Sequence, residues 1–170
     1  MGAVPDDVFR GGFVAGRRTL ARRTGGGAAA VEFALVAPLL LLMVFGIIAY
    51  GFMLSFRQAV SQAAAEGARE AAVTLVEADR SANARSAVTN GLSGYGVSCS
   101  GDKLRRDGKD VGRCLVTEPS KCDPSAESSP MCVSVTVDYY YRDNAMTPTF
   151  PGLGVVMPES LAYTSKVRVS

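Results

Sequence analysis

The longest apolar stretch of the chain runs from Phe33 to Phe56. It holds 24 residues without a charge, and a helix over them, rising about 1.5 Å per residue, spans roughly 36 Å, enough for the hydrocarbon core of a bilayer. Apolar side chains occur on every side of this predicted helix, whereas the core helix of a soluble protein normally has a polar stripe. We therefore favour a membrane span over a soluble core helix. The stretch exceeds an ordinary secretory signal, so we expect it to stay in the mature protein.

Beyond Phe56 an Ala-rich, Pro-free segment predicts that the helix continues out of the membrane to about Val76. A face of mostly small residues recurs along it at three- and four-residue steps: Phe56, Val60, Ala63, Gly67, Ala71 and Leu75. Small side chains allow a helix or a sheet to approach closely, and an Ala-rich stalk exposed to water is the alternative. The pattern breaks at Glu77–Asp79, and residues 81–92 predict a second short helix that stops at Asn90-Gly91.

From Gly94 onward the pattern predicts strands and turns, with strand candidates at residues 96–100, 113–117, 132–141 and 161–169. The third candidate alternates most clearly, because Val133, Val135, Val137, Tyr139 and Tyr141 share one face. These strands predict an antiparallel sheet with one apolar face. The small-residue face of the first helix is the available surface to cover it. Of the remaining segments, residues 102–112 predict a solvated hairpin loop, and residues 119–130 and 144–158 predict Pro-rich loops.

Charges flank the apolar stretch unequally. Residues 1–31 carry five arginines against two aspartates, and four of these arginines lie close to the stretch, at positions 17, 18, 22 and 23. Since the positive flank of a span stays in the cytoplasm, everything after Phe56 is placed outside. From Arg57 onward the chain has 13 basic and 13 acidic residues and no basic stripe, so we expect no nucleic-acid partner. Residues 1–27 lack apolar periodicity, which predicts a disordered leader.

All four cysteines, Cys99, Cys114, Cys122 and Cys132, lie in the part placed outside. Thiols there are normally oxidised, which predicts two disulfides. A four-cysteine zinc site is the weaker alternative, because no two of the cysteines are separated by only two residues. Of three possible connectivities we favour Cys99 with Cys114 and Cys122 with Cys132, since each pair closes a local loop.

The inventory of catalytic residues argues against an enzyme. The chain has no histidine, which removes His-based triads, His metal sites and most general-base mechanisms at neutral pH. It also lacks a phosphate-binding loop that ends in Gly-Lys-Ser or Gly-Lys-Thr. We expect no catalytic residue, no metal and no cofactor.

Glu32 is the most informative single residue. Its carboxylate lies at the beginning of the apolar stretch, where an acid is costly unless it is neutralised or paired. If the chain is cut between Gly27 and Ala28, the new ammonium of Ala28 lies about one helical turn from a carboxylate. A neighbouring subunit's ammonium could then neutralise Glu32 in a helical bundle. An acid that extends to the edge of the membrane is the alternative.

This N-terminal pattern resembles type IV pilin-like precursors, with a basic leader, a glycine at the cut, a glutamate at mature position five and a long apolar helix. More closely, it looks like the TadE family of tight-adherence (Tad) minor pilins or pseudopilins. The resemblance covers roughly residues 22–73 and rests on two quoted runs, GAAAVEFALVAP at 27–38 and QAAAEGAREAA at 62–72. Phe33 replaces the tyrosine that usually follows the glutamate in major Tad pilins, and the exported domain is larger, which favours a minor subunit.

The resemblance implies cleavage after Gly27 by the prepilin peptidase, with Gly27 and Ala28 as the processing site and Glu32 and Phe33 as the assembly residues. It further implies contacts with other pilus subunits and the Tad secretion machinery, and a role in initiating, capping or supporting an adhesion pilus. A permanently anchored bitopic protein with an extracytoplasmic ligand-binding domain is the alternative.

The predicted organisation is α+β and pilin-like, with a long N-terminal transmembrane and stalk helix packed on a small antiparallel sheet. Residues 1–27 form a leader that is removed, 28–56 the membrane helix, 57–92 the stalk and second helix, and 93–170 the disulfide-containing β domain. We expect a single-pass protein of the cytoplasmic membrane with its N-terminus in the cytoplasm and its C-terminal domain outside.

Overall fold

The computed structural model describes residues 26–147 and 157–169. Residues 1–25 of the basic leader, with its five arginines, and residues 148–156 of the Pro-rich segment lie outside the described residues. The chain divides into two compact units, Met1–Leu40 and Leu41–Ser170. Two helices, a 3₁₀ helix and six strands cover the described residues in the order α1 (Gly26–Val73), α2 (Glu77–Leu92), η1 (Ser93–Tyr95), β1 (Val97–Ser100), β2 (Lys103–Arg106), β3 (Lys109–Val116), β4 (Ser120–Lys121), β5 (Met131–Tyr139) and β6 (Leu161–Val169).

In the first unit, the described residues are the beginning of α1. Their apolar side chains are largely exposed, with Phe33 at 72% and Leu39 at 70%. Pro38 lies inside the helix. It has no N–H group, so the carbonyl of Ala34 lacks its usual helical hydrogen bond. Such prolines are tolerated in membrane helices, and α1 continues through this one.

In the second unit, an antiparallel sheet is built around β5. Its strands pair in the order β1-β2-β3-β5-β4, and β6 pairs with β5 over all nine residues. Val135 is paired with Val116 of β3 and with Ser165 of β6, so β5 lies between these two strands. The predicted α+β class, a long apolar N-terminal helix followed by a small antiparallel sheet, is what the structure shows.

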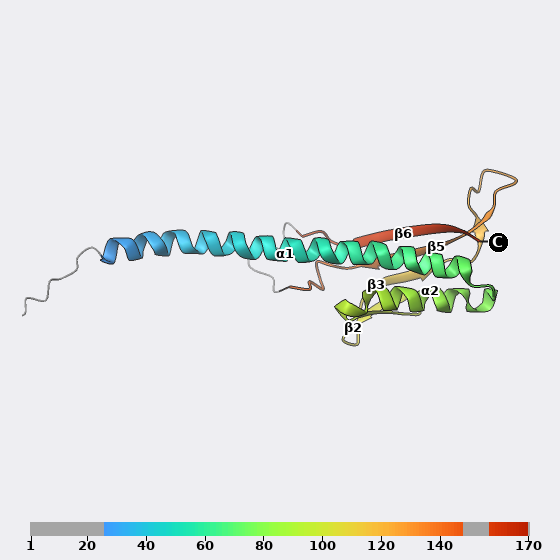
Figure 1. Cartoon of the computed structure of the whole chain (residues 1–170), viewed down its shortest axis with the longest axis horizontal. Helices are drawn as coiled ribbons and strands as arrows, with labels where there is room; N and C mark the ends of the chain where they lie inside the picture. The colour runs from blue at the N-terminus through green and yellow to red at the C-terminus, as the bar shows by residue number, and fades with distance from the viewer. Residues whose placement is uncertain (1–25, 148–156, 170) are drawn as a thin grey trace, which may run out of the picture. The chain divides into compact units, whose positions relative to one another are not determined.

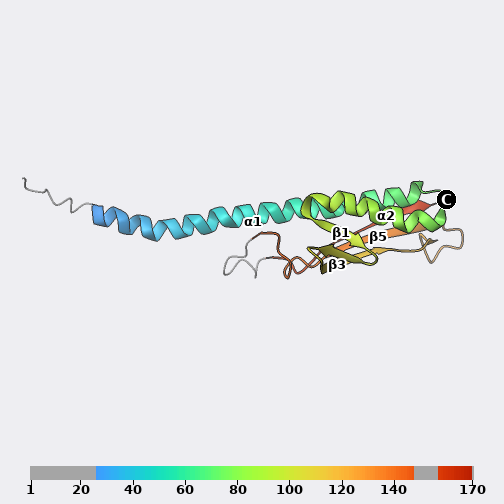
Figure 2. The ribbon, with the colours of Figure 1, turned by 90° about the horizontal axis from the view of Figure 1, so that it is seen from below.

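The later part of α1 and helix α2 cover one face of this sheet (Figures 1 and 2). The apolar face predicted for residues 132–141 is confirmed, because its five residues are all fully buried. The strand itself is shorter than predicted, since β5 ends at Tyr139 and Tyr141 lies in the turn that follows. Gly67 explains how α1 comes so close. A Cβ built on it would lie 2.7 Å from Cγ2 of Val88 in α2 and 3.3 Å from Cγ1 of Val135 in β5. The alternative of a water-exposed Ala-rich stalk is therefore wrong.

The first helix ends earlier than predicted. It stops at Val73 instead of Val76, and Leu75, expected on the packed face, is 97% exposed. β-Branched residues at 73, 74 and 76 weaken the helix, and both the N–H and the hydroxyl of Thr74 donate to the carbonyl of Glu70. The break therefore lies at 74–76, and Glu77 begins α2 instead of interrupting the pattern.

The second helix ends at Leu92, as predicted for residues 81–92, but Asn90-Gly91 is not its stop. Gly91 lies inside α2, where a Cβ would be 3.0 Å from Cβ of Ala63, so this glycine serves the contact between the two helices. Gly96, which follows η1, has a left-handed backbone at φ 68°. Sequence alone does not separate a glycine needed for close packing from one needed for a turn.

Residues 102–112 form the predicted hairpin, but its strands extend almost to the tip where a solvated loop was expected. Asp107 and Gly108 both have positive φ, 51° and 77°, between β2 and β3. An Asp-Gly pair of this kind is the usual two-residue hairpin turn. The charges that suggested a solvated loop pair across the strands, since Lys103 and Arg105 both bind Asp110. The hydrogen bond from Lys103, foremost among these contacts, holds the pKa of Asp110 below its usual value.

Candidate functional site

The residues predicted for processing and assembly lie together at the beginning of α1. Gly27 and Ala28 fall in its first turn, and Glu32 and Phe33 follow in the next. All four are exposed. A Cβ at Gly27 would meet nothing within 4 Å, so its surroundings in the structure do not require a glycine. Whether the bond after Gly27 is cut, and whether Glu32 acts in assembly, stay predictions.

Helical geometry places Glu32 and Ala28 on the same face. They are four residues apart within α1, so their side chains are neighbours on the helix surface. The carboxylate of Glu32 has no hydrogen-bond or ion-pair partner among residues 26–147 and 157–169. A carboxylate at the edge of an apolar helix that the described residues leave without a partner is available to a positive charge.

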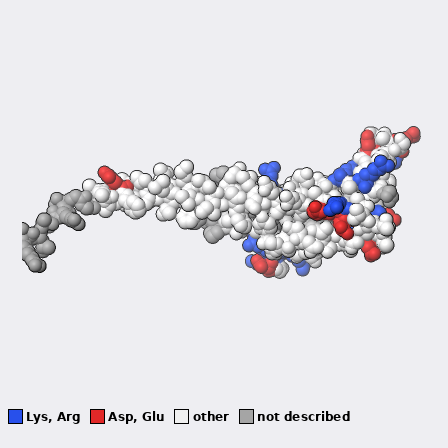
Figure 3. Space-filling view, viewed as in Figure 1, with Lys and Arg blue, Asp and Glu red and all other residues white. Residues whose placement is uncertain are grey.

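Most of the large apolar side chains that follow Glu32 along α1, from Phe33 to Leu54, are exposed. The described part of the chain contains one helix long and apolar enough to cross a membrane, and its most apolar window is not buried in the fold. In Figure 3 acidic atoms, in red, lie near the beginning of α1, and the helix surface that follows is white, the colour of uncharged residues. The exposure argues against the soluble core helix considered above, because a core helix buries its apolar surface.

Phe56 marks the point where α1 becomes buried. Its ring lies edge-on to Tyr95 and to Tyr139, with centroids 4.9 and 4.8 Å away, and tilted to Tyr141 at 6.2 Å. Edge-to-face pairs at such distances add to the gain from burial. The Tyr95 hydroxyl also shares a hydrogen bond of 3.0 Å with Ser55. This aromatic cluster of Phe56, Tyr95, Tyr139 and Tyr141 attaches α1 to the β domain.

Two tyrosines of the aromatic cluster, Tyr139 at the end of β5 and Tyr141 in the turn after it, are fully buried. Burial raises the pKa of Tyr139 and of Tyr141 above the usual value for tyrosine. The Tyr139 hydroxyl accepts a hydrogen bond from Arg106 and donates one to the carbonyl of Asn144. A protonated hydroxyl is needed for that donation, so the cluster favours neutral tyrosine.

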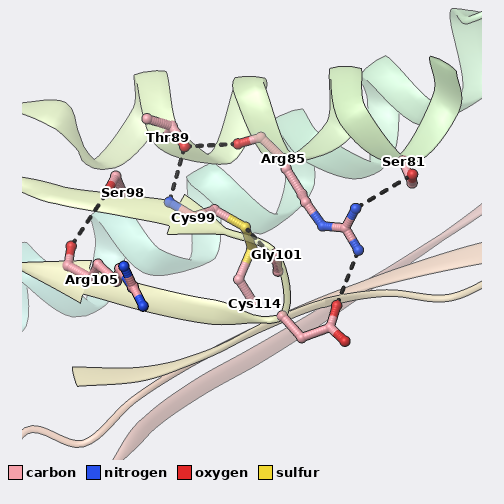
Figure 4. The surroundings of a disulfide bond; sticks show 9 residues. Ser81, Arg85, Thr89, Ser98, Cys99, Gly101, Arg105 and Cys114 are labelled. Atoms are coloured by element: carbon pink, nitrogen blue, oxygen red, sulfur yellow. Dashed lines mark hydrogen bonds and ion pairs between the residues drawn. A yellow bond between two sulfur atoms is a disulfide. The ribbon is translucent and has the colours of Figure 1, made fainter. Parts of the chain in front are cut away.

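The first disulfide joins Cys99 in β1 to Cys114 in β3, with Cα atoms 5.8 Å apart. Figure 4 shows how α2 is held beside it. The N–H of Cys99 donates to the Thr89 hydroxyl, which donates in turn to the carbonyl of Arg85. The Arg85 guanidinium reaches Asp102 at 3.0 Å, in the turn between β1 and β2. The disulfide and these polar contacts fix α2, β1 and β3 as one unit.

The second disulfide joins Cys122 to Cys132 and closes the Ser/Pro-rich loop after β4. The short strand β4, which sequence analysis missed, pairs with the beginning of β5 beside it. Both disulfides have the pairing favoured from the sequence. Within the described residues no group of His, Cys, Asp or Glu is arranged to hold a metal ion.

Sequence analysis gave no role to Tyr95 or Arg57, although both lie where α1 meets the β domain. Tyr95 is 40 positions from its hydrogen-bond partner Ser55, and no local pattern reveals such a contact. Arg57 had a visible signal, since it is the first charge after the apolar stretch. It lines a pocket between α1 and the start of β6.

The comparisons with known proteins agree with the N-terminal pattern. Residues 27–69 match the model of the family described as TadE-like protein. No curated protein and no solved structure matches the chain. The matched segment begins at Gly27 and covers the predicted assembly residues and most of α1. The N-terminal helix of this chain is therefore TadE-like, consistent with a TadE-like protein of the Tad pilus system.

Proposed function

We propose that this chain is a minor pilin or pseudopilin that helps initiate, cap or support a Tad-type adhesion pilus. The observation that carries the proposal is that the TadE-like match begins at residue 27, with the glycine expected at the cut, and includes Glu32. The role is structural and not enzymatic. Its partners are the membrane, the prepilin peptidase, other pilus subunits and the Tad secretion machinery.

In this proposal the chain is inserted with residues 1–27 in the cytoplasm and the disulfide-containing domain outside, because the basic flank precedes the span. The peptidase removes the leader after Gly27. The exposed apolar surface of α1 then packs against the helices of neighbouring subunits, and Glu32 receives the Ala28 ammonium of a neighbour. Pairing with the ammonium removes the cost of an unpaired charge in an apolar bundle.

Mass spectrometry of the chain extracted from the native membrane tests the processing step. The expected N-terminus is Ala28, and a Gly27→Leu variant should keep its leader. A chain that begins at Met1, or elsewhere in the leader, would contradict the pilin proposal and favour a permanently anchored bitopic protein with a ligand-binding domain.

Substitution of Glu32 tests the assembly step separately. Glu32→Ala should be processed normally and yet fail to co-purify with pilus subunits, because the carboxylate that receives the ammonium is gone. Glu66→Ala is a matched control, since Glu66 is an exposed acid further along α1 whose ion pair is with Arg69. Normal co-purification of the Glu32→Ala variant would refute the pairing.

A further inference from the structure

A pocket of about 390 Å³ lies beside the end of the apolar stretch, entirely within the second unit. Its walls include Tyr50, Met53, Leu54 and Arg57 from α1 and Ser160 and Leu161 from the beginning of β6. Met53 and Leu161 are buried, whereas Tyr50 and Arg57 are exposed. The pocket therefore places apolar side chains next to a guanidinium and hydroxyl groups.

The guanidinium of Arg57 is not neutralised by the described residues. Their seven ion pairs involve other lysines and arginines. Residues 148–156, which lie outside the described residues, contain no aspartate or glutamate. Glu159 lies between Pro158 and Ser160, which line the pocket, but does not line it itself. Within the described residues the charge of Arg57 therefore has no acidic partner, which leaves it available to an external anion.

The position along the helix narrows the choice of anion. Arg57 directly follows the 24 uncharged residues, so in a chain that spans the membrane it lies at the level of the lipid headgroups. Tyrosine is enriched at the same level, and Tyr50 lies about two turns before Arg57 in α1. Arginine binds phosphate oxygens through paired N–H groups. A headgroup phosphate has the required charge, and its acyl chains extend along the apolar surface.

We propose that this pocket binds a phospholipid, with Arg57 donating to the headgroup phosphate and Met53 and Leu161 contacting the first part of an acyl chain. The inference rests on the membrane-spanning part of the proposed function and on none of its processing or assembly steps. It assigns a specific lipid contact to the end of the apolar stretch, beyond general immersion of α1 in the bilayer.

Native mass spectrometry of the full chain in nonionic detergent, titrated with phosphatidylglycerol, tests the site. Arg57→Gln should weaken binding of the first lipid about tenfold, the loss expected for a charge-assisted hydrogen bond. Arg69→Gln is the control, because Arg69 is an exposed arginine on the same helix outside the pocket; it should leave binding unchanged. Equal losses in the two variants would overturn the proposal. A thermal unfolding curve for each variant verifies that both remain folded.

Two further ligands distinguish the contribution of the headgroup phosphate from that of the acyl chains and from binding of a free anion. Diacylglycerol with the same acyl chains lacks the phosphate, so it should bind about tenfold more weakly than phosphatidylglycerol and be insensitive to Arg57→Gln. Equal binding of diacylglycerol would overturn the role of the phosphate. Inorganic phosphate should not displace the lipid at millimolar concentration, and displacement would show a site for a free anion instead. The N-terminal mass is measured on the native membrane extract, so failure of lipid binding and failure of the pilin proposal are distinguishable.

Discussion

The two parts of α1 are both apolar and yet have opposite surroundings. From Val31 to Leu54 large side chains such as Phe33, Leu39 and Ile47 are exposed, and among the large ones only Met53 is buried. From Phe56 onward the buried residues are mostly alanines. Large side chains provide contact area for lipid or for neighbouring helices, whereas small ones let α2 and β5 approach closely. Side-chain size along the helix thus separates the surface for external partners from the surface for the chain's own domain.

Phe56→Ala should have the largest effect, because it removes a fully buried ring from the aromatic cluster. The free energy of unfolding of the domain should fall by about 3–5 kcal/mol. Denaturant unfolding in detergent micelles, followed by near-UV circular dichroism of the tyrosines, measures this loss. Leu42→Ala, in the exposed part at 62% exposure, should change domain stability little. Similar losses for both variants would remove the distinction between the two parts of α1.

Gly67→Val should have an intermediate effect. Its Cβ alone would lie 2.7 Å from Val88 and 3.1 Å from the carbonyl of Ala84, so α1 and α2 must separate. Overpacking of this kind costs about 1–3 kcal/mol, measurable in the same unfolding assay. Gly51→Val is the matched control in the exposed part, where a Cβ would meet nothing within 4 Å. A Gly67→Val domain as stable as the parent would mean that the close approach of the helices is not needed.

Alkaline titration should give the smallest and most localised effect. Burial raises the pKa of Tyr139 and Tyr141 in the folded state. The stability that these two groups contribute is therefore fully present below pH about 10, the usual pKa of tyrosine. It is lost as pH rises through the raised pKa values of the folded state. Absorbance of tyrosinate should show these two tyrosines ionising above the usual pKa of tyrosine. The loss of domain stability above pH about 10 should be smaller in the Tyr141→Phe variant, because phenylalanine cannot ionise. Titration of all six tyrosines together at the usual pKa would contradict the burial of the cluster.

Local patterns predicted the elements whose signal lies in a single stretch. The alternation of Val133, Val135 and Val137 identified the buried face of β5, and the small-residue face of α1 identified the surface that packs on it. The boundaries were less predictable, because the end of α1 depends on how Thr74 bonds back to Glu70. The strands of the β2–β3 hairpin were missed for a different reason. Their charged side chains form ion pairs across the strands, and the sequence alone does not show which charges pair.

The candidate functional residues also differ in how far they could be predicted from the sequence. The segment from Gly27 to Phe33 is contiguous, so its spacing could be recognised from the sequence, and the TadE-like match covers it. The pocket at Arg57 combines residues about 100 positions apart in the chain, and only the fold brings them together. No periodicity within either segment predicts that contact.

The sequence by itself determined the apolar helix and the residues before it, the alternating β5 and an oxidised set of cysteines, because each follows from composition or spacing along the chain. Only the tertiary structure decided that Gly67 and Gly91 serve helix packing and not turns, that Tyr95 joins Phe56, and that Arg57 borders a pocket with Leu161. The physical reason is that packing depends on distances between residues far apart in sequence, whereas hydropathy and helical spacing are local properties of the chain.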